Sequence, residues 1–173
     1  MTGMAGDDPH VLEAGHAPTP FTAAEIREGC PPGRTVRLRV EATGEPTATR
    51  IIRFLDGDEH GGSQEFLNID ADGASLGPAS TARSTWLEFQ SHASFPSDRT
   101  AVTREQLETP IGSLMCLRYT VANNDAVDTF WFAEQLPGMP VAFTKRVDGE
   151  LVSRVTMISN EVETFPGDVD QPR

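Results

Sequence analysis

A chain of 173 residues fits one domain and is long enough to bury a core without disulfide or metal staples. Its net charge of −12 repels phosphate, which argues against nucleic acid and anionic membrane surfaces as partners. Only 38% of the residues are hydrophobic, and the two ends are poor in large apolar side chains. We therefore predict disordered tails over 1–20 and 162–173 on either side of one β domain at 21–161.

The first segment, Met1–Ala17, has neither the basic region nor the apolar core of a signal peptide. Nowhere does an apolar run approach the roughly 18 residues that cross a bilayer. We therefore expect a cytoplasmic protein without membrane insertion.

Residues 22–28 carry the signals of one short helix. Thr22 and Glu25 form a T-x-x-E capping box, and Phe21 before them can act as a hydrophobic staple. Gly29 stands where helices commonly end, and the two prolines that follow forbid continuation. Because a helix this short is unstable alone, we expect it to dock on the rest of the domain.

Alternation of apolar and polar side chains predicts strands over 34–41, 48–55 and 64–70. The first strand would place Val36 and Leu38 on one face. Arg34, Arg37 and Arg39 could form a basic patch that binds an acidic partner. The alternative, which is more common, is an ordinary solvent-facing row of a strand with no binding role. The third strand would pair Leu67 and Ile69 on one face, and a long loop should follow over 70–82.

The longest strand is expected over 84–95. Its two faces would carry Leu87, Phe89, Ala93 and Phe95 on one side and Trp86, Glu88, Gln90 and His92 on the other. Further alternating runs lead to a hairpin around Asp148-Gly149, in which Phe143 would lie opposite Arg154 as a cation–π pair.

The connections between these strands are short, which favours antiparallel neighbours because parallel strands need crossovers of a dozen residues or more. We predict a mostly β (α+β) fold. It would be a single curved antiparallel sheet or half-open barrel of about eight strands with one short N-terminal helix. The concave face of such a sheet can hold an apolar ligand.

Two side chains of the longest strand are the candidate catalytic residues. If their face lines a cavity, His92 and Glu88 could act as a general base and its orienter, or as metal ligands. If the face is solvated, which the pattern favours, they are ordinary surface residues. Cys30, expected to be the more exposed of the two cysteines, could be a nucleophile, but no spacing links it to a histidine.

The Gly-rich segment 56–62 gathers oxygen and nitrogen ligands. Asp56, Asp58 and His60 could hold a cation, although the segment does not match an EF-hand loop. The alternative, which we favour, is a polar hairpin loop. The sequence accordingly predicts no cofactor and no metal beyond these weak candidates.

Three aromatic residues in succession, Phe130-Trp131-Phe132, would place rings on both faces of one strand. Together with Trp86 and Met139, Trp131 and Phe132 could line a binding site for an apolar ligand. The alternative is ordinary core packing, which also accounts for rings at strand spacing.

The span from Ser84 to Met157 resembles the curved half-barrels of the LolA/LolB-like and related bacterial families. The resemblance is carried by Phe95-Pro96, Thr109-Pro110-Ile111-Gly112, Tyr119, Phe130-Trp131-Phe132 and Leu136-Pro137-Gly138-Met139-Pro140. It implies a curved sheet with an apolar concave face, where those families hold acyl chains or lipoproteins. The chain differs from them at its start, since no signal peptide or lipobox is visible there.

From these observations we expect a non-enzymatic cytoplasmic domain that binds an apolar small molecule or a partner protein on the concave face. The alternatives are a small β-barrel or cupin-like enzyme that uses His92 and Glu88, with or without a metal, and a homo-oligomer that buries its exposed sheet face against a second copy.

Overall fold

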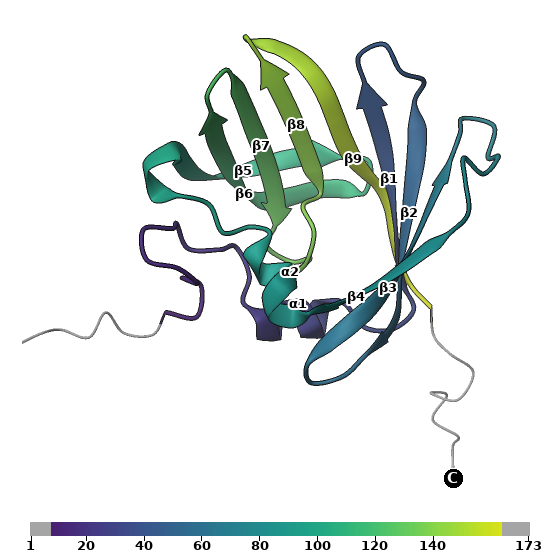
Figure 1. The fold of residues 1–173 in the computed structure, drawn as a ribbon, viewed down its shortest axis with the longest axis horizontal. Coiled ribbons are helices and arrows are strands. Elements are labelled where there is room, and N and C mark those ends of the chain that lie inside the picture. The colour runs from purple at the N-terminus through teal and green to yellow at the C-terminus, as the bar shows by residue number, and fades with distance from the viewer. Residues whose placement is uncertain (1–7, 164–173) are drawn as a thin grey trace, which may run out of the picture.

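Nine strands form one antiparallel sheet in this computed structural model, which describes residues 8–163 (Figure 1). The strands are β1 (Arg34–Ala42), β2 (Ala48–Gly57), β3 (Gly61–Ile69), β4 (Ser80–Thr85), β5 (Thr100–Thr109), β6 (Gly112–Asn123), β7 (Ala126–Ala133), β8 (Ala142–Val147) and β9 (Glu150–Val162). Within the described residues their order is β4-β3-β2-β1-β9-β8-β7-β6-β5, and the edge strands β4 and β5 do not pair to close a barrel. The predicted curved antiparallel sheet is confirmed.

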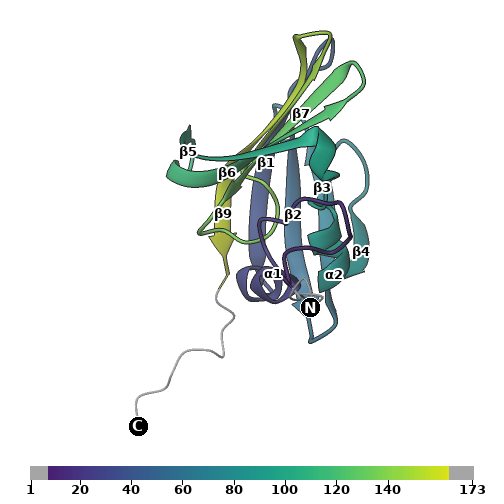
Figure 2. The same ribbon diagram turned by 90° about the vertical axis from the view of Figure 1, so that its left-hand side faces the viewer.

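Two α-helices, α1 (Ala23–Gly29) and α2 (Trp86–Ser91), lie inside the curve of the sheet (Figures 1 and 2). A short 3-10 helix at Ser97–Arg99 follows α2. Neither α-helix in this part of the chain has the length and apolar character needed to cross a membrane.

The pairing of β1 with β9 joins two meanders, because every other pair of neighbouring strands is consecutive in the chain. The β1–β9 register shifts between Arg37 and Leu38, and further shifts occur between Phe54 and Asp56 and between Lys145 and Arg146. Bulges of this kind bend a sheet and increase its twist. Figure 2 shows the result, with β5 and β6 running crosswise to β1 and β2.

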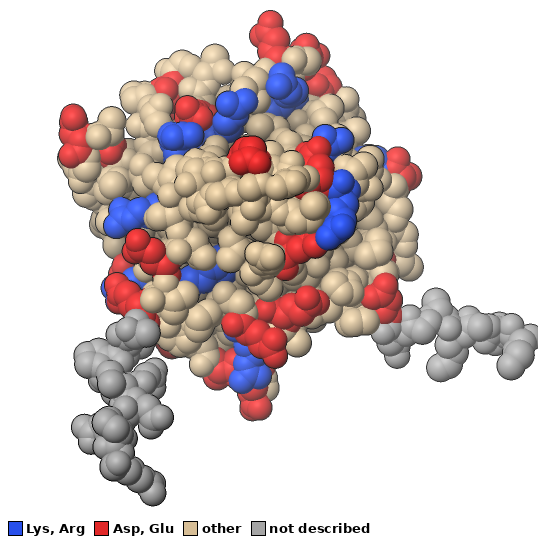
Figure 3. Space-filling view, turned by 180° about the vertical axis from the view of Figure 1, so that it is seen from behind, with Lys and Arg blue, Asp and Glu red and all other residues tan. Residues whose placement is uncertain are grey.

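Strand β1 has the expected alternation, with Val36 fully buried and Arg37 exposed. The candidate basic patch does not form, because Arg34 lies on the same face as Val36 and is only 2% exposed, whereas Arg37 and Arg39 lie on the other face. On the face seen from behind, basic side chains are interspersed with acidic ones (Figure 3).

Helix α1 forms where it was predicted, and both hydrogen bonds of the Thr22–Glu25 capping box are present. Ile26 is its buried residue. The helix ends against the β7–β8 connection, where a Cβ on Gly29 would lie 2.8 Å from Cβ of Pro137. This close approach accounts for a glycine at the helix end.

The predicted strand over 84–95 is wrong, because β4 ends at Thr85 and α2 begins at Trp86. The hydroxyl of Thr85 accepts from the Glu88 amide (3.0 Å), and the Glu88 carboxylate accepts from the Thr85 amide (2.8 Å). This is a second T-x-x-E capping box. The buried Gln90 and Ala93 follow Trp86 at helical spacing, so tertiary packing selects the helix over the strand that the same residues also fit.

The segment 8–20, expected to belong to a disordered tail, packs against the folded domain. The Ala17 amide donates to the carbonyl of Phe95 (2.8 Å), and the Tyr119 hydroxyl donates to the carbonyl of Pro18 (2.6 Å). The predicted tail residues 1–7 and 164–173 lie outside the described part of the chain.

The hairpin between β8 and β9 turns at Asp148 and Gly149, which have φ values of 51° and 82°. The Phe143–Arg154 pair is not formed, because the shift at Lys145 displaces the register by one residue and sets Phe143 opposite Val155. The ring of Phe143 instead packs on Phe130, with centroids 4.8 Å apart.

Buried Arg34 ties together three segments that are far apart in the sequence. Its Nε donates to Oδ1 of Asn160 on β9 (2.8 Å). Its Nη1 donates to the carbonyls of Gly29 (3.0 Å) and Pro137 (2.9 Å) and to Sγ of Cys30 (3.1 Å). The guanidinium thus holds the end of α1 and the β7–β8 connection against the β1–β9 seam.

Replacing this guanidinium should destabilise the whole domain. In Arg34→Met, the two carbonyls and Asn160, all half-buried, lose their donor, so we expect the free energy of unfolding to fall by about 2 kcal/mol. The measurement is urea denaturation followed by tryptophan fluorescence.

Arg37→Met is the matched control on the outer face of the same strand, and we expect it to change the free energy by less than about 0.5 kcal/mol. Equal losses in the two variants would contradict the role given to Arg34.

Candidate functional site

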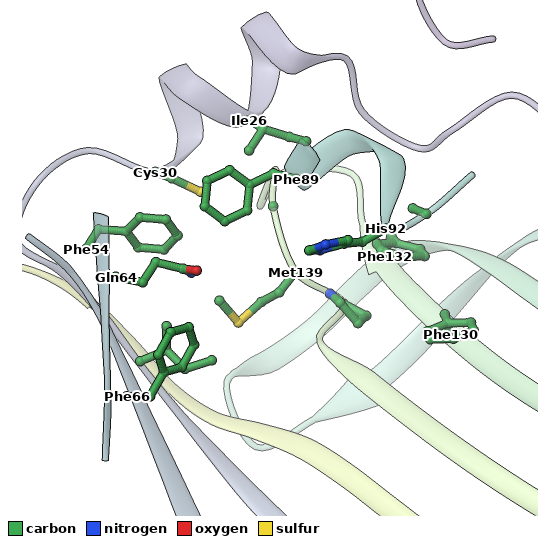
Figure 4. Close-up of a pocket in the computed structure, with 14 residues that line it drawn as sticks. Ile26, Cys30, Phe54, Gln64, Phe66, Phe89, His92, Phe130, Phe132 and Met139 are labelled. Carbon is green, nitrogen blue, oxygen red and sulfur yellow. The ribbon is translucent and has the colours of Figure 1, made fainter. Parts of the chain in front are cut away.

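An apolar cavity of about 310 Å³ lies between the concave face of the sheet and the two helices (Figure 4). Its lining comes from α1, β2, β3, α2, β7 and the β7–β8 connection. The fourteen lining residues are Ile26, Cys30, Ile52, Phe54, Gln64, Phe66, Phe89, His92, Ala93, Phe130, Phe132, Gly138, Met139 and Pro140. Segments from most of the chain therefore meet at this one site.

Strand alternation and register decide which side chains reach the cavity. In the β2–β3 pair, Ile52 lies opposite Phe66 and Phe54 lies opposite Gln64. These four side chains line the cavity in two cross-strand rows. Strand alternation puts Leu67, which the sequence paired with Ile69, on the other face.

Of the four side chains proposed to hold a ligand, Phe132 and Met139 line the cavity. Trp86 lies outside the lining and is a core residue, 5% exposed, with its ring packed on Phe89 at 5.6 Å between centroids. Its Nε1 donates to the carbonyl of Asp58 (2.7 Å).

Trp131 also lies outside the cavity, because its neighbours Phe130 and Phe132 occupy the concave face and alternation turns it to the other one. Its Nε1 donates to the Glu105 carboxylate (2.6 Å), which also pairs with Arg118 at 3.2 Å. The three adjacent aromatics do place rings on both faces, but only the outer two point at the cavity.

Gln64 and Phe66 are among the lining residues that the sequence did not mark as site residues. The signal that could have found them is the pairing of the 48–55 and 64–70 runs as one hairpin. Its concave row would then continue from Ile52 and Phe54 onto the neighbouring strand.

The proposed pair of His92 and Glu88 does not form. Glu88 closes the capping box of α2 through the Thr85 amide. His92 is the C-cap of α2 and lies exposed at the rim of the cavity. Helical spacing leaves the two residues one turn apart, but the Glu88 carboxylate is occupied at the N-terminus of α2, and no ion pair joins it to His92 among the described residues.

The candidate metal ligands are engaged by an arginine. Nη1 of Arg83 lies 3.0 Å from Oδ1 of Asp56, and Nη2 lies 2.7 Å from Oδ2 of Asp58. The backbone amides of His60 and Gly61 also donate to Asp58, and these bonds, with the nearby Arg83 charge, lower its pKa. Across residues 8–163, no cluster of three or more His, Cys, Asp and Glu side chains is placed to hold a metal ion.

The two cysteines are both free and both buried, with Cys30 2% and Cys116 0% exposed, so Cys30 is the more exposed of the two by a negligible margin. Burial raises the pKa of the Cys30 thiol, and the neighbouring Arg34 opposes this rise. Burial also raises the pKa of Cys116 to about 11, with contributions from the charges of Glu105 and Glu134. Neither thiol is therefore activated as a nucleophile.

No family model matches the chain, and no curated protein matches its sequence. Among solved structures, MucB in complex with MucA(peri) has a TM-score of 0.57 at 12% identity, over 82% of this chain and 55% of the matched chain. MucB in a separate crystal structure has a TM-score of 0.54 at 11% identity, over 83% of this chain and 58% of the matched chain.

This chain thus spans a little over half of the MucB chains that it matches. The likeness supports the curved β fold that the sequence led us to expect. The link to the LolA/LolB-like families stays at the level of a resemblance.

The buried thiols give a prediction that tests this part of the site. At about pH 8, the native protein should react with Ellman's reagent at least ~100-fold more slowly than the protein in concentrated guanidinium chloride, because both thiols are protonated and covered. Cys116→Ala isolates the rate of Cys30. A Cys30 that reacts in the native state as fast as in the unfolded state would show that the cavity wall is open.

Proposed function

We propose that this chain is a non-enzymatic domain that binds an apolar small molecule in the cavity on the concave face of its sheet. The observation that carries this proposal is the cavity itself. Its walls come from two helices, three strands and the β7–β8 connection. Twelve of its fourteen lining residues are apolar side chains, a glycine or a cysteine, and the two polar exceptions are Gln64 and His92.

The size and character of the cavity fit a ligand site. Small-molecule sites in proteins are commonly about 300–1,000 Å³, mostly apolar, with a few polar groups that orient the ligand. A space of this size also lowers the stability of the domain, because the surrounding side chains lose packing contacts. A guest molecule would restore those contacts and remove its own apolar surface from water.

Met139 is the most adaptable part of the wall. It belongs to the β7–β8 connection, packs against both hydrophobic clusters of the domain and faces the cavity opposite Gln64 (Figure 4). Because the thioether side chain is flexible, it can adjust to guests of different shape.

Two comparisons support a binding role. The LolA/LolB-like families, which the second half of the chain resembles, hold acyl chains or lipoproteins on a concave sheet face. MucB, a structure of similar fold, is known in complex with MucA(peri). A cytoplasmic location is part of the proposal, and the two free cysteines are compatible with it.

The neutral dye N-phenyl-1-naphthylamine gives the first test, since its fluorescence rises when it leaves water. We expect saturable binding at one site in the full chain. Met139→Trp should weaken this binding at least about tenfold, because the larger ring fills the cavity.

Met115→Trp is the matched control, since Met115 is exposed on β6 and lies outside the cavity lining. It should leave the affinity for the dye unchanged. Absence of saturable binding, or equal weakening in the two variants, would contradict the proposal.

A partner protein is the second candidate, and the free edges of the unclosed sheet favour it. Strand β4 pairs on one side only and exposes most of its residues. Such an edge can add a strand from another chain, including a second copy of this one.

Self-pairing through these edges predicts a dimer whose fraction rises with protein concentration in light scattering. A monomer at every working concentration would rule out the homodimer and leave only a different protein as the partner.

A further inference from the structure

Two glutamines are buried in this domain, and they differ in their hydrogen bonding. The side chain of Gln90 is satisfied. Its Oε1 accepts from the Ala23 amide (2.9 Å), and its Nε2 donates to the carbonyl of Pro9 (2.7 Å) and to Oγ1 of Thr19 (2.9 Å). Gln64 is only 9% exposed, and no described residue hydrogen-bonds to its side-chain amide, whose atoms keep some access to the cavity.

Gln64 points into the cavity. It comes from β3, where it lies between Phe54 on β2 and Ala82 on β4. Figure 4 shows the end of its side chain directed into the space that Phe89 and Met139 border. The amide therefore has no partner in the wall and faces the volume that a guest would fill.

The rest of the lining sets limits on what can pair with this amide. No Asp, Glu, Lys or Arg is among the lining residues. The Cys30 thiol is already engaged, since it accepts from Arg34 and donates to the carbonyl of Pro137. His92 lies at the exposed rim. In the interior of the cavity, Gln64 is thus the polar side chain that remains available to hydrogen-bond a bound ligand.

We infer that the ligand is a neutral molecule with an apolar body and one hydrogen-bonding head, and that the Gln64 amide binds this head. An amide, carbonyl or hydroxyl group fits, because glutamine both donates and accepts. A pure hydrocarbon would leave the amide unpaired and dry. A carboxylate or ammonium head would place a charge in an interior that no Asp, Glu, Lys or Arg lines to neutralise it. The inference rests on the proposed function and specifies its ligand class.

A structural role does not account for Gln64. A leucine at this position would fill similar space beside Phe54, Phe66 and Ile52 without placing an unpaired amide at an apolar wall. Positions that break such a packing rule with no compensating contact tend to be functional sites.

The test uses three probes with the same two-ring body, namely 2-naphthamide, naphthalene and 2-naphthoate, titrated calorimetrically into the full chain. We expect 2-naphthamide to bind about tenfold more tightly than naphthalene, as one well-placed hydrogen bond in a buried site allows. We expect 2-naphthoate to bind more weakly than 2-naphthamide.

Gln64→Leu should bring the affinity for 2-naphthamide down to that of naphthalene, without lowering the midpoint of thermal unfolding. Gln90→Leu is the matched control. It should lower that midpoint, because three hydrogen bonds are lost, and it should keep the preference for the amide.

The outcomes separate the two proposals. If naphthalene binds as tightly as 2-naphthamide, or if Gln64→Leu keeps the preference, the cavity remains a binding site and the role of Gln64 is overturned. If 2-naphthoate binds most tightly, the neutral head is overturned. If none of the three probes binds, the proposed function fails, and the inference fails with it.

Discussion

The buried guanidinium of Arg34 is the interaction on which the cavity depends. It has no carboxylate partner within 4 Å among the described residues, and its Nε and Nη1 are instead shared between the end of α1, the β7–β8 connection and β9. The connection needs Gly138 at the closest point, where φ is +127° and a Cβ would lie 2.9 Å from Sγ of Cys30. Because α1 and the connection both supply walls of the cavity, one buried cation fixes the shape of the space between them.

The curvature of the sheet supplies the opposite wall. Bulges in the β1–β9, β2–β3 and β8–β9 pairs bend the sheet around the two helices, so that rows of side chains from distant strands face one space. The domain thereby keeps an apolar cavity and, in Gln64, an amide at its wall that has no hydrogen-bond partner among the described residues. The cavity lowers stability in the free protein, and a neutral, polar-headed guest would complete both its packing and the hydrogen bonding of the Gln64 amide.

Local patterns in the sequence predicted much of the fold and less of the site. The capping box at Thr22 and the alternation around Val36 act over a few residues, and both predictions were correct. The second capping box, at Thr85, lies in a stretch where Leu87, Phe89 and Ala93 also fit a period of two, so the local pattern alone favours a strand there. That strand prediction placed Glu88 and His92 on one imagined strand face. Alternation alone does not say whether Trp131 or its two neighbours face the cavity. The structure decides this by placing Trp131 against Glu105 of another strand, on the opposite face.

The sequence by itself determined the antiparallel β class, helix α1, the outward direction of Arg37 and Arg39 on β1 and the sharp turn at Asp148-Gly149. Each of these depends on hydrogen bonds and side-chain alternation within a short stretch of chain. Only the tertiary structure decided that Arg34 is buried, that α2 is a helix and that Gln64 faces a cavity. These outcomes depend on the pairing of β1 with β9 and on the docking of both helices, which bring together residues more than a hundred positions apart.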